Sequence, residues 1–397
     1  MIFLFPFFFF QQIIWVKATD AAGWSPRWGH TSVVAQNRIW VIAGGDERIW
    51  KNDVWYSFNG IDWFLAIDSS PWTPRHGAVS LVRNDTLWLF GGCDQNGFKS
   101  DVWFSPDGIN WEKRIDSAPW TPRWGHRIVL FHNQFWLLGG EDRNLNLKND
   151  VWYSEDGRDW HLATPSADWS PRCRHTALNF RNKIWILGGT DGRVRNDVWY
   201  SEDGRNWILA NSSAQWPPRS CYTAAVFQDK IWLGGGLDSL NLRNDVWYSE
   251  DGINWEEALP VAPWSRRRCN TLVSFDNRLW VLGGNDGTPR NDIWYTSGLS
   301  VSEDTFQKIL SPQIFPNPFS KSTLIRYRSQ EKEKISISVY SILGEKIKTL
   351  IKENVISGGY TIIWDGRDDK GKEVPKGIYL LRFSLAKNNY LFPLIKI

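Results

Sequence analysis

The sequence has few cysteines and no motif that assigns a metal, a phosphate or a nucleophile. Its 397 residues include four cysteines, Cys93, Cys173, Cys221 and Cys269, and none forms a C-x-x-C pair. This argues against a zinc ribbon, a thioredoxin-type centre and a dense disulfide framework. A phosphate loop of the G-x-x-x-x-G-K type is absent, and no Ser/His/Asp or Cys/His arrangement follows from the spacing. We therefore assign no catalytic residue, no metal and no cofactor.

Net charge and long apolar runs are also scarce. Lys and Arg number 46 against 43 for Asp and Glu, so we expect neither nucleic acid nor an acidic membrane surface as a partner. The apolar run 2–10 is too short for a membrane-spanning helix, and no membrane-spanning segment is predicted. It fits the apolar region of a signal peptide, although no Lys or Arg precedes it and no A-x-A site follows. We expect residues 1–14 to be an export signal, with a buried first strand as the alternative.

Tryptophan, by contrast, is abundant, with 28 residues, and most of them belong to a repeat. Three marks recur six times in constant order: a W-x-P-R-like turn, an apolar strand ending in Gly-Gly, and N-D-V-W-Y-S or a close variant. The turn tryptophan recurs every 47 to 49 residues, and the sixth turn has Arg266 in place of proline. The six turn arginines are Arg27, Arg75, Arg123, Arg172, Arg219 and Arg267.

Each repeat contains four short strand signals separated by turn residues, and no segment has a sustained helical period. In the third repeat the signals cover 127–131, 134–138, 151–154 and 160–163. Asp156-Gly157 supplies the tight turn between the last two. The sixth repeat lacks its fourth strand, and a matching segment, Trp15-Val-Lys-Ala18, precedes the first repeat. We expect this N-terminal strand to complete the last sheet, which leaves no open edge.

Four-stranded sheets repeated at this length predict a β-propeller, and the three marks resemble those of the Kelch family. The resemblance covers residues 15–297. It implies an all-β fold, a six-bladed Kelch-type β-propeller closed by the N-terminal strand. The S-x-D-G-x-x-W strings also resemble the Asp-box of sialidase-like propellers, but each is one residue short. We interpret them as hairpin turns.

The last hundred residues have a different pattern. Residues 298–312 are polar and are interpreted as a linker, and residues 313–397 contain alternating strand signals that predict a small C-terminal Ig-like β-sandwich. Four marks occur there in order: Pro316-Asn-Pro-Phe319, Val339-Tyr-Ser-Ile-Leu-Gly344, Trp364-Asp-Gly-Arg-Asp368 and Lys376-Gly-Ile-Tyr379. They resemble the sorting domain of type IX secretion cargo and the related FlgD Ig-like family.

This second resemblance implies export across both membranes of a Gram-negative bacterium. The secretion machinery would be the partner of residues 313–397, and the location would be extracellular or on the outer cell surface. The sorting domain would then be removed. A plain Ig-like cap is the alternative.

The six turn arginines suit carboxylates and sulfates, because a guanidinium can hold such a group with two hydrogen bonds. The Kelch resemblance places them on one face with the loops after Gly-Gly, which cover 46–48, 94–96, 141–144, 191–193 and 238–239. Because they occur in every repeat, we favour the interpretation that each is a scaffold residue that bonds carbonyls of the neighbouring blade, and ligand binding is the alternative. The better ligand candidates vary between repeats; they are Trp28, His76, Trp124, Arg174, Tyr222 and Arg268, with Glu141 and Asp191 as the acids of the channel.

Histidines and cysteines also occupy equivalent positions in different repeats. His30, His126 and His175 could together bind a metal, but they lie in separate repeats without an accompanying carboxylate. We expect rings bonded to the backbone instead. Cys221 and Cys269 are equivalent in adjacent repeats. A disulfide requires Cα atoms within about 7 Å and inner strands of neighbouring blades are usually farther apart, so we expect free thiols.

Three functions remain open at this point. The favoured one is a secreted or cell-surface binding propeller that recognises a protein or glycan ligand through one face of the ring. The alternative is a propeller enzyme of the sialic-acid-epimerase type that acts on sugars in the central channel. A buried carboxylate with a raised pKa beside a channel arginine would favour that enzyme. The third is a structural spacer.

Overall fold

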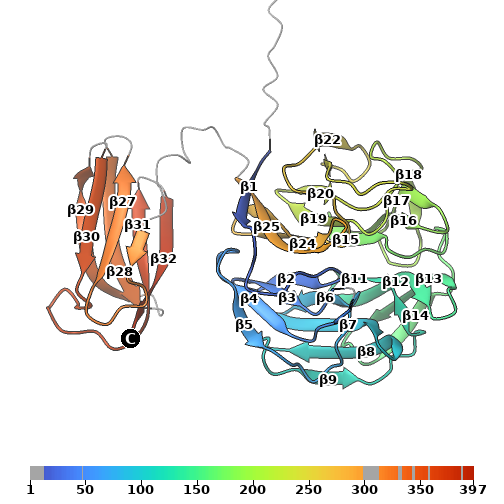
Figure 1. Cartoon of the computed structure of the whole chain (residues 1–397), viewed down its shortest axis with the longest axis horizontal. Coiled ribbons are helices and arrows are strands. Elements are labelled where there is room, and N and C mark those ends of the chain that lie inside the picture. Colours follow the sequence, from blue (N-terminus) through green and yellow to red (C-terminus); the bar gives the residue numbers. More distant parts are fainter. Residues whose placement is uncertain are drawn as a thin grey trace, which may run out of the picture. The chain divides into compact units, whose positions relative to one another are not determined.

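In the computed structural model, the described residues of the chain form strands joined by turns and loops (Figure 1). The structure describes residues 13–46, 48–297, 313–329, 333–341, 345–355, 358–385 and 388–397. The chain divides into two compact units, Met1–Leu299 and Ser300–Ile397. Almost all of the expected export signal 1–14, and the whole linker 298–312, lie outside the described residues. Within the described part of the chain, we find no helix with the length and hydropathy needed to span a bilayer.

The first unit consists of six small antiparallel sheets, numbered here in chain order. Sheet 1 contains β2 (Thr31–Ala35), β3 (Arg38–Ile42), β4 (Val54–Ser57) and β5 (Phe64–Ile67), and sheet 2 contains β6 (Val79–Arg83), β7 (Thr86–Asp94), β8 (Gly97–Ser105) and β9 (Glu112–Ile115). Sheet 3 contains β10 (Arg123–Trp124), β11 (Arg127–Phe131), β12 (Gln134–Asp142), β13 (Leu147–Ser154) and β14 (Trp160–Thr164). Sheet 4 contains β15 (Thr176–Phe180), β16 (Lys183–Thr190), β17 (Val194–Ser201) and β18 (Ile208–Asn211). Sheet 5 contains β19 (Thr223–Phe227), β20 (Lys230–Gly234), β21 (Val246–Ser249) and β22 (Glu256–Leu259).

Sheet 6 combines the two ends of the unit. It contains β23 (Thr271–Phe275), β24 (Arg278–Asn285), β25 (Pro289–Ser297) and, as its fourth strand, β1 (Ile14–Thr19). β1 pairs antiparallel with β25, so that Trp15 lies opposite Thr296. The N-terminal strand therefore completes the last sheet, as the spare tryptophan indicated.

Neighbouring sheets contact one another through their first strands. These contacts run in the order β2, β6, β11, β15, β19 and β23, and β23 also contacts β2. In Figure 1 the first strands lie toward the middle of the unit, and the fourth strands β5, β9, β14 and β22 lie at its rim. This all-β arrangement of small antiparallel sheets is consistent with the Kelch-type propeller predicted from the repeat.

The tryptophans form the packing between the sheets. Each turn tryptophan is at most 1% exposed and packs edge-to-face on the fourth-strand tryptophan of its own sheet, with ring centroids 5.9–6.2 Å apart. The pairs are Trp24–Trp63, Trp72–Trp111, Trp120–Trp160, Trp169–Trp207, Trp216–Trp255 and Trp264–Trp15. Such pairs add stability beyond the apolar area that they bury. The abundance of tryptophan is thus structural.

The S-x-D-G-x-x-W strings are hairpin turns that also fit each sheet to its neighbour. Ser154 Oγ accepts the amide of Gly157 at 2.8 Å, and the Asp156 carboxylate accepts the next two amides at 2.9 Å. Gly157 has a φ of +78°, and a Cβ there would lie 2.6 Å from the Trp88 ring of the preceding sheet. Only glycine fits both requirements, so the interpretation as hairpin chemistry is confirmed.

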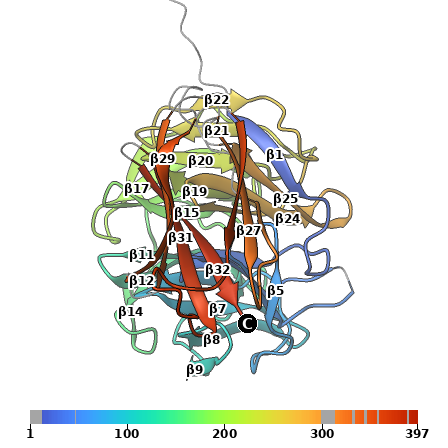
Figure 2. The same cartoon turned by 90° about the vertical axis from the view of Figure 1, so that its left-hand side faces the viewer.

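The second unit contains two antiparallel sheets that share one core (Figures 1 and 2). One sheet contains β26 (Gln313–Phe315), β27 (Thr323–Ser329) and β30 (Gly358–Trp364), and the other contains β28 (Glu333–Ser341), β29 (Lys346–Val355), β31 (Gly377–Leu385) and β32 (Asn388–Lys396). Ile325 and Trp364 of the first sheet and Ile337 and Phe383 of the second are fully buried in that core. Two sheets with one core are the arrangement expected of a β-sandwich.

Candidate functional site

The six turn arginines are buried, and their side chains bond within their own sheets. In sheet 5, the Arg219 guanidinium lies 2.5 and 2.8 Å from the two oxygens of Asp245 and donates to the Gly235 carbonyl at 2.9 Å. Every repeat has the same bidentate pair, and each arginine is at most 1% exposed. The pairs are Arg27–Asp53, Arg75–Asp101, Arg123–Asp150, Arg172–Asp197, Arg219–Asp245 and Arg267–Asp292.

The backbone of these arginines holds the neighbouring sheet. The Arg219 amide donates to the Arg195 carbonyl at 3.0 Å, and the Arg219 carbonyl accepts the Gly189 amide at 3.1 Å, both in sheet 4. Each arginine therefore joins two sheets, with its side chain in its own sheet and its main chain against the preceding one. The expectation that the guanidinium bonds carbonyls of the neighbouring blade is wrong in this respect. The guanidinium groups of the six turn arginines are thus buried, and the aspartates of their own sheets take their donors.

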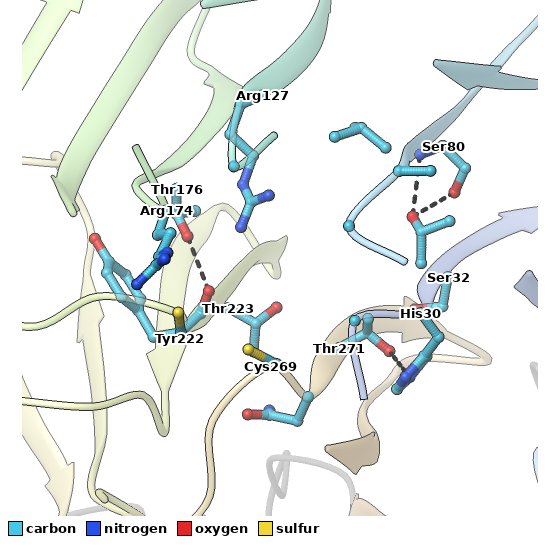
Figure 3. Close-up of a pocket in the computed structure, with 18 of the residues that line it drawn as sticks. His30, Ser32, Ser80, Arg127, Arg174, Thr176, Tyr222, Thr223, Cys269 and Thr271 are labelled. Atoms are coloured by element: carbon cyan, nitrogen blue, oxygen red, sulfur yellow. Dashed lines mark hydrogen bonds between the residues drawn. The ribbon is translucent and has the colours of Figure 1, made fainter. Parts of the chain in front are cut away.

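A cavity of about 240 Å³ lies where the first strands begin. Five of the variable candidates line it: Trp28, His76, Trp124, Arg174 and Tyr222. Figure 3 shows Arg174 and Tyr222 on one side of this cavity and His30 on the other. The structure thus brings together candidates that are up to 194 positions apart in the chain.

One wall of the cavity is aromatic. The His76 ring lies 5.2 Å from Trp28, 4.7 Å from Trp50 and 5.9 Å from Trp124, measured between ring centroids. The Arg174 guanidinium lies 4.3 Å above the Trp124 ring, a cation–π contact. Burial lowers the pKa of His76 to about 4, so this ring is neutral at pH 7. The wall is therefore aromatic and, apart from the Arg174 cation at its edge, uncharged at neutral pH.

Arg127 is the cavity residue that the sequence reasoning missed. It begins β11, lines the cavity, and in Figure 3 its side chain points into the open space. Its guanidinium donates to the His126 carbonyl at 3.3 Å, and no ion pair to it occurs among the described residues. Burial lowers the pKa of Arg127 below the ordinary value for arginine, because no carboxylate in the described part of the chain lies close enough to offset the loss of solvent. The available signal was the repeat itself, since the equivalent residues are Thr31, Val79, Thr176, Thr223 and Thr271.

Two buried polar side chains also line the cavity without full sets of partners. Asn270 is 5% exposed, and neither its Oδ1 nor its Nδ2 has a hydrogen-bond partner among the described residues. His30 is also 5% exposed; its Nε2 lies 3.2 Å from Thr271 Oγ1, while its Nδ1 has no such partner. Buried polar groups in native proteins almost always find a partner, in the chain, in water or in a ligand. In both residues these atoms are themselves buried from solvent, so they are enclosed beside the cavity and are not open to it.

Comparison with family models agrees with the repeat and with the architecture. The model described as KLHDC2/KLHL20/DRC7 Kelch-repeats domain matches residues 125–330, just over half of the chain. The chain belongs to the Kelch-repeat family. A search of curated proteins found no match. We call residues 13–297 the Kelch unit from here on.

A second family model, described as Secretion system C-terminal sorting domain, matches residues 313–396. It supports the resemblance to type IX secretion cargo and implies export, with a secreted or outer-surface location in a bacterium. The Kelch match runs past the boundary between the two compact units at Leu299 and Ser300 and overlaps the sorting-domain match. Strands β26 and β27 belong to the second unit.

The acidic candidates and Arg268 of the Kelch unit do not line the cavity. No Asp or Glu is among the described residues that line it, and Arg268 is exposed. Glu141 accepts the Cys173 thiol at 3.4 Å. Burial raises the pKa of Asp191, but hydrogen bonds from Arg195 and Ser170 outweigh this and lower it to about 2. Asp191 is therefore an ionised, paired carboxylate and is unsuited to act as a base near neutral pH.

The three equivalent histidines lie beside the turn tryptophans. The ring centroids of His30, His126 and His175 are 5.8, 5.9 and 6.1 Å from Trp24, Trp120 and Trp169. Backbone hydrogen bonds with Leu282 and Arg123 contribute to the pKa values of His30 and His126, in line with the backbone bonding that we expected. By strict bond geometry, the ring nitrogens of His126 and His175 have no partner among the described residues. Searching the described residues for three or more His, Cys, Asp or Glu that could hold a metal ion gives no group.

Proposed function

We propose that this Kelch protein is an exported binding module whose central cavity takes an anionic group of a protein or glycan ligand. Arg127 is the main support for the proposal, because a half-buried guanidinium without a carboxylate partner lies in a cavity whose described lining contains no acid. Arg174 adds a second cation at the same cavity. A hydrogen bond to a charged group stabilises by about 1.5–3 kcal/mol, and a guanidinium can offer two to one carboxylate or sulfate.

The size and the walls of the cavity indicate how such a ligand would sit. At about 240 Å³ the cavity is smaller than the about 300–1,000 Å³ of sites that enclose a whole small molecule. It therefore suits one end or one branch of a larger ligand. Trp28 and Trp124 line the same cavity as the two cations, and aromatic side chains suit contact with a sugar ring or an aromatic side chain.

The enzyme alternative has no supporting observation. It required a carboxylate with a raised pKa beside an arginine in the channel. Asp191 has a lowered pKa, and neither Asp191 nor Glu141 lines the cavity. Binding is the function that these residues support.

The binding proposal predicts a specific loss in the Arg127→Met variant. On arrays of glycans and peptides, the mature chain should bind acidic members, and Arg127→Met should weaken that binding by about 10- to 100-fold, the equivalent of one lost charged hydrogen bond. Arg181→Met is the matched control, because Arg181 lies in an exposed pair with Asp229. Binding should also weaken as salt rises. Arrays without any hit at micromolar sensitivity, or equal binding by Arg127→Met, would contradict the proposal.

We also propose that the six sheets are the blades of one closed ring, and that β1 closes the ring by pairing with β25. The pairing of β1 with β25 supports this, as do the contacts between β23 and β2. Two further bonds join sheet 6 to the first turn: the Gly284 amide donates to the Arg27 carbonyl at 3.1 Å, and the Asn291 amide group donates to the Trp24 carbonyl at 2.9 Å. The same two bonds recur between consecutive sheets elsewhere in the Kelch unit.

If β1 closes the ring, Trp15→Ala should lower the free energy of unfolding by about 3–5 kcal/mol, the usual cost of removing a buried tryptophan. Trp15 is 7% exposed and packs on Trp264. Leu65→Ala is the control, because Leu65 lies on the equivalent fourth strand of sheet 1 and is 46% exposed. Urea denaturation measures both variants. Size-exclusion chromatography should show oligomers of Trp15→Ala, because the freed edge of β25 can pair with another chain. An elution profile and a urea midpoint like those of the wild type would argue against ring closure by β1.

A further inference from the structure

The cavity contains two neighbouring thiols that the binding function does not use. Cys221 and Cys269 both line it, at equivalent positions of sheets 5 and 6. All four cysteines of the chain are free. The Cys269 amide donates to the Cys221 carbonyl at 2.8 Å. Such a bond holds two chains at about the 4.8 Å spacing of paired strands, within the about 4.4–6.8 Å that disulfides span between Cα atoms. The two cysteines are thus closer than the usual spacing of inner strands led us to assume.

The backbone position of these cysteines does not require a side chain. The equivalent residues of sheets 1 to 3 are Gly29, Gly77 and Gly125, and all six positions have a φ between +53° and +66°. Glycine adopts this conformation without strain, whereas Cys221 and Cys269 adopt it with a Cβ. Strained positions of this kind cluster where a side chain has a functional role. The scaffold accepts glycine here, so the thiols are not needed to build the turn.

The surroundings divide the two thiols into a nucleophile and a proton donor. A hydrogen bond from the Cys269 thiol lowers the pKa of Cys221; burial opposes this, and the charges of Arg174, Arg268 and Arg127 reinforce it. The same hydrogen bond and burial raise the pKa of Cys269 well above its ordinary value. The thiolate is the reactive form of cysteine in exchange with disulfides. We take Cys221 as the attacking sulfur because its amide also donates to the carbonyl of Arg174, a cation of the same cavity, and Cys269 as the adjacent thiol that resolves the product.

We propose that Cys221 and Cys269 form a thiol–disulfide exchange site, reached through the cavity, whose substrate is a low-molecular-weight disulfide that carries negative charge. The Arg127 guanidinium lines the same cavity and would hold the charged end of that substrate. The charge preference rests on the proposed anion-binding function, whereas the pairing of the two thiols stands on their own geometry.

The reaction balances as two successive exchanges. The Cys221 thiolate attacks one sulfur of R–S–S–R, the S–S bond breaks, and R–S⁻ leaves and takes a proton from solvent. Cys269 then attacks the Cys221 sulfur of the mixed disulfide and gives its proton to the second departing R–S⁻. Two protein thiols are oxidised to one disulfide, and R–S–S–R, the oxidant, is reduced to two R–SH.

The test follows the chromogenic disulfide 5,5′-dithiobis(2-nitrobenzoic acid) reacting with the full-length chain. We expect a fast release of two equivalents of thiol, and peptide mass mapping should find a Cys221–Cys269 disulfide. Cys269→Ser should release one fast equivalent and keep the adduct on Cys221, whereas Cys221→Ser should lack the fast phase. Cys93→Ser is the matched control and should retain it, because Cys93 does not line the cavity. A fast phase that persists in Cys221→Ser, or mapping without the Cys221–Cys269 bond, would overturn the exchange site.

A second arm tests the charge of the substrate. Dithiodiglycolate is an anionic disulfide and cystamine a cationic one, and each rate is divided by the rate of the same reagent with free N-acetylcysteine. We expect the normalised rate to be about 10-fold or more higher for the anion at low salt, with the difference shrinking at high salt. Equal normalised rates, with the Cys221–Cys269 disulfide still formed, would overturn the charge preference and count against the proposed anion binding, but not against the thiol pair.

Discussion

The Asp245→Ala variant is expected to lose about 3–5 kcal/mol of its free energy of unfolding, because it leaves a buried cation without a partner. The Arg219 side chain has no exposed surface, and that of Asp245 is 7% exposed. The Trp247 indole also donates to the Asp245 carboxylate, at 2.8 Å, and would lose its acceptor. Since Arg219 holds sheet 4 through its backbone, the effect should spread beyond sheet 5.

Chemical denaturation followed by tryptophan fluorescence measures this loss. Asp229→Ala is the control, because the Asp229 side chain is 74% exposed in its pair with Arg181, and exposed pairs contribute about 0–1 kcal/mol. The double variant Arg219→Met/Asp245→Leu should recover part of the stability, because it removes both buried charges together. An Asp245→Ala chain within about 1 kcal/mol of the wild type would contradict the scaffold role of the pair.

Acid should destabilise the Kelch unit from a pH of about 6.5 downward, before its carboxylates become protonated. Burial and the nearby charges of Arg27 and Arg123 lower the pKa values of His30 and His126 to about 3, and burial also lowers the pKa of His175. In the unfolded chain a histidine takes up its proton near pH 6.5. Between that pH and about 3 the unfolded state binds more protons than the folded state, so stability falls as the pH falls. Each histidine accounts for up to about 1.4 kcal/mol per pH unit.

Denaturation midpoints at pH 7.5, 6.0 and 5.0 measure this slope. His126→Tyr should flatten it, because the equivalent residue of sheet 5 is Tyr222, which shows that a tyrosine fits this position. His161→Gln should leave the slope unchanged, because His161 is exposed. The buried aspartates affect stability only at lower pH. Burial raises the pKa of Asp245, but the bonds and charge of Arg219 outweigh burial and lower it. The stability that the Asp245 carboxylate contributes is therefore lost only as the pH falls below about 3.9, where the unfolded chain takes up the proton. A slope that does not change in His126→Tyr would show that the buried histidines are not its cause.

The sheets could be predicted because their determinants are local. The turn at Asp156-Gly157 is held by bonds to Ser154 and Asp156 themselves, and the spare Trp15 matched the fourth-strand tryptophans of the other repeats. The strands of sheet 3 run longer than expected, since β12 and β13 continue pairing beyond a bulge between Leu138 and Gly140. A strand pattern that stops at glycine cannot reveal pairing that resumes after it.

The site was harder to predict because its residues come from different repeats. The role of Arg219 depends on Asp245, and both residues recur in all six copies, so a constant Arg together with a constant Asp was the signal for a scaffold pair. Asp191 was placed among the channel acids because the sequence does not show that Arg195 neutralises it. Arg127 stands out only when the six copies are aligned and one guanidinium appears among small residues.

The partnership of β1 with β25 also constrains when the Kelch unit can mature. Trp15 is synthesised early, but the residue that it pairs with, Thr296, is synthesised only near the end of the Kelch unit. Contacts between residues so far apart in sequence form slowly, and exposed strand edges attract other chains in the meantime. In a chain made and moved from its N-terminus, sheet 6 acquires its last strand only after nearly the whole unit is present.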